Sequence, residues 1–292
     1  EFDIMKRKHS ILLILLALFA LLVGCSDDTV TPQGTTDTVT ADKDAAEAVA
    51  ADVGADDGGL TDQLEDLAIS IDGLGSAKAV NAMVPANGFA SRTYDELTGV
   101  WTIVIDRERG LPEGVPYASI ERTYTMQFLN DLGEPMQYCV VDGDTASSME
   151  FVIVSGAGLH RTRRLEQHLD ALSGGFTVTG LNQDLVTVNG SYHREAGNSL
   201  ETPVFARTLD GVLDMDVIDV VMPRGPRQNF SAAVSGTLEG TFTADITITR
   251  GDDYTEQHIE REFSIVLGDG EATMAMNGSV YRMNLNLGEL ND

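Results

Sequence analysis

From about residue 93 to its end, the chain alternates hydrophobic and polar residues with a period of two. In residues 254–267, for example, Ile259 and Phe263 fall on one face and Glu260 and Glu262 on the other. Successive side chains of a strand point to opposite faces, so this pattern is typical of antiparallel strands with one buried and one solvated face. The segments that predict strands are 100–106, 120–129, 149–154, 241–250 and 254–267.

Glycine-rich turn signals separate these segments. Gly251-Asp252-Asp253, Gly268-Asp269-Gly270 and Ser173-Gly174-Gly175 predict tight hairpin turns. Because long strands follow one another without helices between them, we expect a mainly β fold, a long antiparallel meander that forms a curved sheet or an open barrel. A compact immunoglobulin-like sandwich is the alternative, but its strands are usually shorter and its cysteine pair is missing here.

A short repeat lies within this region: Asn189-Gly-Ser-Tyr-His-Arg194 is similar to Asn277-Gly-Ser-Val-Tyr-Arg282. Asn-Gly forms either a two-residue hairpin turn or a bulge inside one long strand. For the second copy we expect a bulge, because a single strand 271–287 would then match 254–267 in length.

Before residue 76 the pattern changes to helical. Residues 42–53 are alanine-rich and predict a short helix that Asp42 or Asp44 caps. Residues 60–72 predict a second helix, with Thr61 as its cap and leucines at helical spacing.

The N-terminal region has the pattern of a secretory signal. Met5, the expected initiator after four leading residues, begins a short basic segment, and Ile11 to Val23 follow without a charge. This apolar run is shorter than the ~20 residues that a membrane-spanning helix needs. It ends in Leu22-Val23-Gly24-Cys25, which resembles the lipobox of bacterial lipoproteins.

This resemblance implies that Cys25 receives lipid on its sulfur and amine and becomes the mature N-terminus. We therefore expect a signal peptide over 1–24, a flexible Thr- and Asp-rich tether over 25–41, a short helical segment over 42–75 and a single antiparallel β domain over 76–292. The expected location is the cell envelope, with the membrane as partner through the N-terminal lipid. Aspartate after the cysteine resembles an inner-membrane retention signal of enteric bacteria. Ser26 stands there instead, which favours the outer membrane, on its periplasmic face or at the cell surface.

Charge narrows the range of partners. The chain holds 46 acidic and 19 basic residues, for a net charge of −27. Nucleic-acid binding is disfavoured, because phosphate contacts need a basic face. Adhesion of the protein surface itself to an anionic membrane is disfavoured for the same reason.

The most unusual local sequence is Leu159–Asp170, which we expect to form one continuous strand. Arg161, Arg163 and Arg164 make it a positive segment in an acidic chain, and they are the candidate anion-binding residues, because arginine suits bidentate recognition of carboxylates. The alternative is a cross-strand ladder in which these arginines pair with acids such as Glu260.

No catalytic residue, metal ligand or cofactor site is predicted. On one continuous strand, His160 and His168 would lie more than ~20 Å apart, too far to share a metal. Acid pairs such as Asp214-Met215-Asp216 are expected near turns, where such pairs are usually solvated. Cys139 is expected to be a buried, inert thiol, and no internal disulfide is expected.

These features favour a lipid-anchored, non-catalytic binding or structural protein of the envelope. A carrier of a lipid or another hydrophobic ligand is an alternative, because a curved sheet with helices packed on it resembles the architecture of periplasmic carriers of lipids and lipoproteins. A hydrophobic ligand or an envelope protein would then be the partner. A hydrolase that acts on envelope polysaccharide is the other alternative, since two carboxylates can come from distant strands.

Overall fold

The structure is a computed structural model that describes residues 34–54, 59–64, 89–224, 230–268 and 271–291. The predicted signal peptide and Cys25 lie outside these residues, as does most of the predicted second helix. That helix is described only over residues 60–64.

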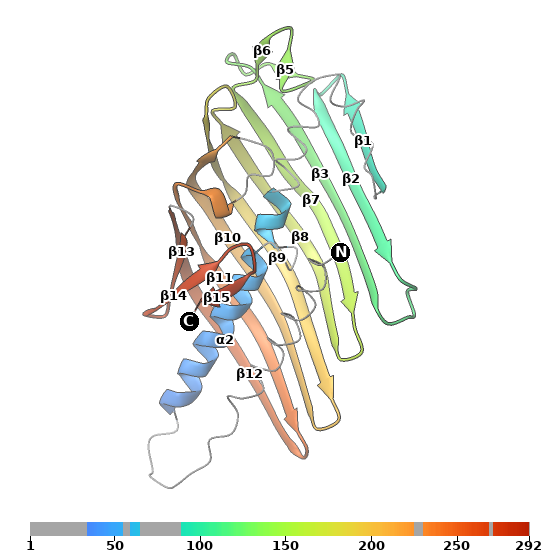
Figure 1. Cartoon of the computed structure of the whole chain (residues 1–292), viewed down its shortest axis with the longest axis vertical. Helices are drawn as coiled ribbons and strands as arrows, with labels where there is room; N and C mark the ends of the chain where they lie inside the picture. Colours follow the sequence, from blue (N-terminus) through green and yellow to red (C-terminus); the bar gives the residue numbers. More distant parts are fainter. Residues whose placement is uncertain (1–33, 55–58, 65–88, 225–229, 269–270, 292) are drawn as a thin grey trace, which may run out of the picture. The chain divides into compact units, whose positions relative to one another are not determined.

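Within the described residues, thirteen strands form one antiparallel sheet (Figure 1). Strands that are neighbours in the chain are neighbours in the sheet, in the order β1-β2-β3-β7-β8-β9-β10-β11-β12-β13-β14-β15. In addition, β4 pairs with β3, and β5 and β6 form a separate hairpin. The predicted mainly β meander is thus confirmed, and the sheet is open, because β1 and β15 lie at its two edges. The strands are β1 (Phe89–Asp95), β2 (Val100–Arg109), β3 (Tyr117–Leu129), β4 (Pro135–Met136), β5 (Val140–Val141), β6 (Asp144–Thr145), β7 (Ser148–Arg161), β8 (Leu165–Thr179), β9 (Leu185–Thr202), β10 (Phe205–Pro223), β11 (Ser235–Arg250), β12 (Asp253–Gly268), β13 (Glu271–Met276), β14 (Ser279–Asn284) and β15 (Glu289–Asn291), with a short 3-10 helix η2 (Phe230–Ala232) before β11.

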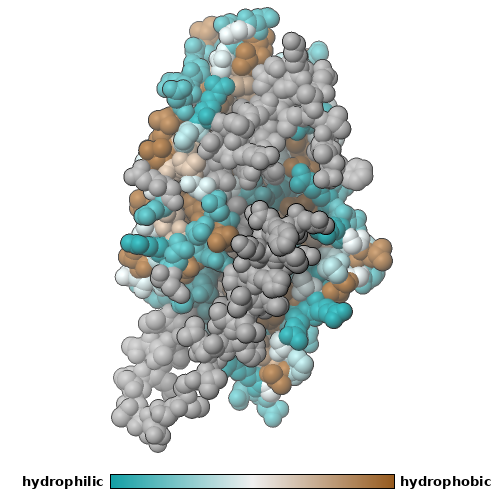
Figure 2. Space-filling model, in the orientation of Figure 1, coloured by the Kyte–Doolittle hydropathy of each residue, from teal (hydrophilic) through white to brown (hydrophobic). Residues whose placement is uncertain are grey.

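The two faces of the sheet differ as the alternation predicts. Along β10, Leu213, Met215 and Val217 are buried, whereas Asp214 and Asp216 between them are exposed. We call the face with the buried side chains the inner face and the opposite one the outer face. In the view of Figure 2, hydrophilic and hydrophobic residues are interspersed over the described part of the surface.

Helix α2 (Gly34–Val53) packs on the inner face of the sheet. Its buried positions recur every three or four residues, as one side of a helix requires, and most are alanines that let the helix approach the sheet closely. The buried apolar residues are Ala41, Ala45, Ala46, Val49, Ala50 and Val53. The helix begins at Gly34 rather than at residue 42, so it takes in the second half of the predicted tether. Once the alanine-rich part is held by packing, adding turns to a helix is easy.

Thr61 has a different role from the predicted one. The helical residues 60–64 begin before it, and its hydroxyl donates a hydrogen bond to the carbonyl oxygen of Val53, at 2.6 Å. Thr61 therefore caps the C-terminal end of α2, where carbonyl groups lack partners within the helix.

Two predictions about glycine were wrong. Ser173-Gly174-Gly175 lies inside β8. A Cβ on Gly174 would sit only 2.7 Å from the carbonyl oxygen of Ser191 on the neighbouring strand. The glycine there permits close approach of the chains and forms no turn. Conversely, Asn277 and Gly278 form the turn between β13 and β14, where their φ values of 47° and 82° suit a tight hairpin better than a bulge.

Candidate functional site

Three arginines of the inner face form ion pairs with three aspartates of the helical segment. Arg122 of β3 pairs with Asp62 at 2.8 Å, and Arg194 of β9 pairs with Asp52 at 2.8 Å. Arg261 of β12 pairs with Asp42 at 2.5 Å. The three aspartates follow one another at intervals of ten residues, and the three arginines come from strands spread across the sheet.

The strand register explains this spacing. Arg194 lies opposite Leu213, which lies opposite Phe242, which lies opposite Arg261. The two arginines are therefore in one row across the sheet, three strand steps or about 14 Å apart. Ten residues of α-helix rise about 15 Å. A helix that crosses the strands thus places Asp42 and Asp52 directly at the two arginines (Figure 1).

Two of the three arginines are well shielded from water, whereas the side chain of Asp62 is 37% exposed. Arg122 is 3% exposed and Arg194 is 7% exposed. Asp42 also accepts a hydrogen bond from the side-chain amide of Asn277, at 2.8 Å. Next to Arg194, the hydroxyl of Tyr192 accepts a hydrogen bond from the amide of Gln63, at 3.1 Å, and burial raises the pKa of Tyr192. Buried charges are costly unless they are paired, so the pairs favour one docked position of the helix over others.

A pocket of about 950 Å³ lies between the helical segment and strands β2, β3, β7, β8, β9 and β10. We call it the inner pocket. One wall is the helical segment, with Ala48, Ala51 and the Arg194–Asp52 pair. The floor is a row of apolar or small residues across neighbouring strands: Ile120, Gly158, Leu169 and Ala196.

The far rim of the inner pocket is polar and partly basic. Arg107 and Arg109, both exposed, line it at its β2 end. Among the described residues, neither of them makes an ion pair or a side-chain hydrogen bond. His160 is also on this rim, with its Nδ1 3.0 Å from the amide oxygen of Gln167. That oxygen only accepts, so Nδ1 carries the hydrogen in this contact.

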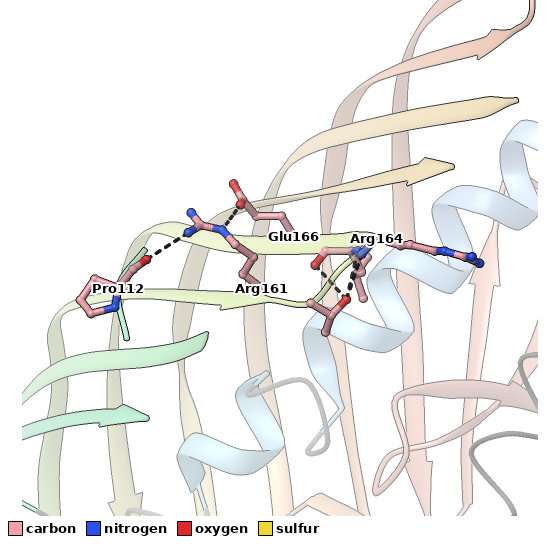
Figure 3. A network of polar contacts seen from close by, with 6 residues as sticks. Pro112, Arg161, Arg164 and Glu166 are labelled. Atoms are coloured by element: carbon pink, nitrogen blue, oxygen red, sulfur yellow. Dashed lines mark hydrogen bonds and ion pairs between the residues drawn. The ribbon is translucent and has the colours of Figure 1, made fainter. Parts of the chain in front are cut away.

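The predicted anion-binding arginines lie at the hairpin between β7 and β8 (Figure 3). Arg161 ends β7 on the outer face, where its Nε donates to Glu166 at 2.5 Å and its Nη1 donates to the carbonyl oxygen of Pro112 at 3.1 Å. Arg163 and Arg164 are exposed in the turn, and Arg164 points away from Arg161. These residues are near one another in the sequence, but the structure does not bring their guanidinium groups together.

The continuous strand over Leu159–Asp170 is a wrong prediction. Thr162 closes a turn with Leu165 through its backbone N–H, at 2.7 Å, and its hydroxyl accepts from the N–H of Leu165 at 3.1 Å. As a result Leu159 lies opposite His168, and His160 opposite Gln167, so the two histidines are close in the sheet rather than more than 20 Å apart. They lie on opposite faces, because neighbouring positions of a strand alternate.

The outer face carries histidines that contact carboxylates. His193 Nδ1 lies 2.7 Å from Asp214, and its Nε2 lies 3.2 Å from Glu195. The hydrogen bond to Asp214 is the main cause of a raised pKa of His193. Asp214 lies in the middle of β10 and not near a turn, which corrects the sequence prediction. In the described part of the chain, no three His, Cys, Asp or Glu side chains are grouped so as to hold a metal.

Cys139 is buried in the bend between β4 and β5, rather than inside a strand. The guanidinium of Arg224 donates a hydrogen bond to its sulfur, at 3.9 Å. This burial agrees with the predicted structural role of the residue.

The three inner-face arginines were missed, although the alternation contained a signal. Arg122 stands between Ile120 and Tyr124, two residues from each, at a position where the period-two pattern calls for an apolar side chain. Arg261 stands in the same phase between Ile259 and Phe263. A charge in the apolar phase of a strand requires a buried partner, and the helix aspartates are that partner.

Comparison with known proteins gave no relatives: no family model, no curated protein and no solved structure matches this chain. None of the helices in the described ranges combines the length and the hydropathy of a membrane-spanning segment.

Proposed function

We propose that this protein is a lipid-anchored, non-catalytic binding protein of the cell envelope, and that its ligand occupies the inner pocket. The observation that supports this most is the pocket itself. Its volume of about 950 Å³ is in the range of small-molecule sites, and it combines an apolar floor with a few polar groups on one rim. The lipobox residue Cys25 supports the anchor.

The position of α2 bears on what the ligand is. A hydrophobic ligand that replaced α2 on the inner face would have to separate the Arg194–Asp52 and Arg261–Asp42 pairs and leave their charges in apolar surroundings. A ligand in the inner pocket leaves all three pairs intact. The pocket is therefore the favoured binding site over the helix-covered part of the sheet.

The anchor is tested by labelling. Cells that express the full chain and are fed labelled palmitate should incorporate the label, and Cys25→Ala should abolish labelling and release the protein from the membrane fraction. Unlabelled, soluble wild-type protein would contradict the anchor.

The binding role is tested by native mass spectrometry of the full chain extracted from its membrane. A co-purified small molecule should be present in the wild type and lost in Ala196→Leu, which fills the pocket floor. Val152→Leu is the matched control, because Val152 lies on the outer-facing side of β7 and is exposed. A mass retained equally by all three proteins would count against the inner pocket.

A further inference from the structure

We infer that the ligand of the inner pocket is an elongated organic anion, with its anionic group at Arg107 and Arg109 and its apolar body along the pocket floor. This inference rests on the proposed binding function and adds the chemical class and the orientation of the ligand.

The anionic group is assigned from the two arginines. Arg107 and Arg109 continue the phase of the buried residues Ile103 and Ile105 of β2, so both lie on the inner face. Two residues apart on one strand, they are about 7 Å from each other, close enough for both guanidinium groups to reach one carboxylate or phosphate. Arginine binds such groups through paired, charge-assisted hydrogen bonds.

Charge pairing favours an anion over a cation. The acids in the pocket wall, Asp52 and Asp62, already face Arg194 and Arg122. A third acid, Glu108, also lines the pocket, but it stands between Arg107 and Arg109 in the opposite phase of β2. Arg107 and Arg109 have no ion-pair partner among the described residues, and the four arginines of the lining outnumber its three carboxylates, so the surplus charge of the pocket is positive in a chain whose net charge is −27. His160, whose Nδ1 donates to Gln167, also lines the pocket.

The apolar body is assigned from the floor. Arg107 lies opposite Ile120, and the same row continues over Gly158, Leu169 and Ala196. A ligand held by its anionic end at β2 therefore meets apolar side chains from there onward. The small residues in the row leave space for the ligand. Even a Cβ on Gly158 would approach the carbonyl oxygen of Ser119 to 3.1 Å.

The length of the floor indicates an extended ligand. The pocket reaches from β2 across β3, β7, β8 and β9 to Leu209 of β10, which is five strand steps. At about 4.8 Å a step, this is about 24 Å, the length of a long-chain amphiphile and much more than a simple anion needs.

Calorimetric titration of the full chain carrying Cys25→Ala, which keeps lipid and detergent out of the assay, tests the assignment. Three probes are compared: decanoate, decyltrimethylammonium with the same tail and the opposite charge, and acetate with the head alone. We expect decanoate to bind and the other two to bind at least roughly tenfold more weakly, because each lacks one of the two kinds of contact.

Substitutions in the pocket test where the anionic end and the apolar end of the ligand bind. Arg107→Gln with Arg109→Gln should weaken decanoate binding by roughly tenfold or more, and Ala196→Leu should weaken it through the tail. Arg163→Gln with Arg164→Gln is the matched control, because these arginines are equally exposed but lie in the β7–β8 turn. Near-ultraviolet circular dichroism checks that every variant keeps the packing of the wild type.

The inference is overturned if decyltrimethylammonium binds as tightly as decanoate, if the Arg107/Arg109 variant binds normally, or if the control variant loses binding instead. Failure of decanoate to bind, together with a co-purified molecule that Ala196→Leu removes, would reject the anionic ligand and leave the binding function standing. If decanoate does not bind and no molecule co-purifies with the protein, the binding function is rejected as well.

Discussion

Arg194 shows how a single charged residue is accommodated in this fold. It lies on the inner face of β9, is almost fully buried and donates from Nε to Asp52 at 2.8 Å. Burial has the largest single effect and lowers the pKa of Arg194, but the attraction of Asp52 and the contact with Tyr192 together outweigh it, so the pKa is raised. The energetic importance of the pair lies less in its attraction than in the cost of leaving one charge behind.

Replacing Arg194 by alanine should therefore lower the free energy of unfolding by about 3–5 kcal/mol, measured by urea denaturation. The double variant Arg194→Met with Asp52→Leu should recover much of this loss, because no charge then stays buried without its counterion. Arg164→Ala, on the exposed turn, is the control and should change stability by less than about 0.5 kcal/mol. If Arg194→Ala were as stable as this control, the Arg194–Asp52 pair would not be a buried pair that stabilises the fold.

The raised pKa of His193 predicts that the stability of the fold depends on pH. Its pKa is raised in the folded state, chiefly by the hydrogen bond to Asp214, with Glu195 adding to it. A raised pKa means that the folded state holds the proton more tightly, so this stabilisation is full below the unfolded value of about 6.5 and is lost as the pH rises through the folded pKa. Asp214→Asn should lower the pKa of His193 in an NMR titration, and His193→Gln should remove this part of the pH dependence. A His193 pKa unchanged by Asp214→Asn would show that the contact is absent in solution.

At the scale of elements, the C-terminal end of α2 is held by close backbone packing. A Cβ on Gly54 would collide with the backbone of Gly288, in the turn before β15. Gly54→Ala should therefore destabilise the protein by roughly 1–3 kcal/mol, because backbone cannot move aside as a flexible side chain can. Gly175→Ala is the control: a Cβ there meets nothing within 4 Å, so its thermal midpoint should match that of the wild type. Equal midpoints for the two variants would place the helix end elsewhere.

The elements differ in how far the sequence alone predicts them. Strands such as β11 and β12 were predictable, because their burial depends only on local alternation and the Gly251 turn between them. The turn at Thr162 was not, because it depends on side-chain hydrogen bonds of one threonine and contains no glycine or proline. The candidate site was predictable least of all, since the inner pocket arises from register across six strands and from where α2 crosses them.

At the scale of the whole domain, the helix and the sheet depend on each other. Most helical stability in proteins comes from tertiary packing of an apolar side rather than from helix propensity. Here the packing side of α2 is apolar, and its Asp42 and Asp52 reach strands β12 and β9, while Asp62 of residues 60–64 reaches β3. The helix thus links strands that are far apart in the sheet and makes one wall of the inner pocket.

Hydrogen exchange followed by mass spectrometry tests this dependence. Peptides from the buried half of α2, residues 41–53, should exchange as slowly as those from β9 and β10, because the helix opens only when the sheet does. Arg194→Ala should speed exchange in the helix far more than in β10, since it removes one of the two ion pairs between α2 and the sheet and leaves the strand ladder intact. Edge strand β15 supplies the fast reference within the same sample. Rapid exchange of residues 41–53 in the wild type would mean that the ion pairs at Asp42 and Asp52 do not hold the helix on the sheet.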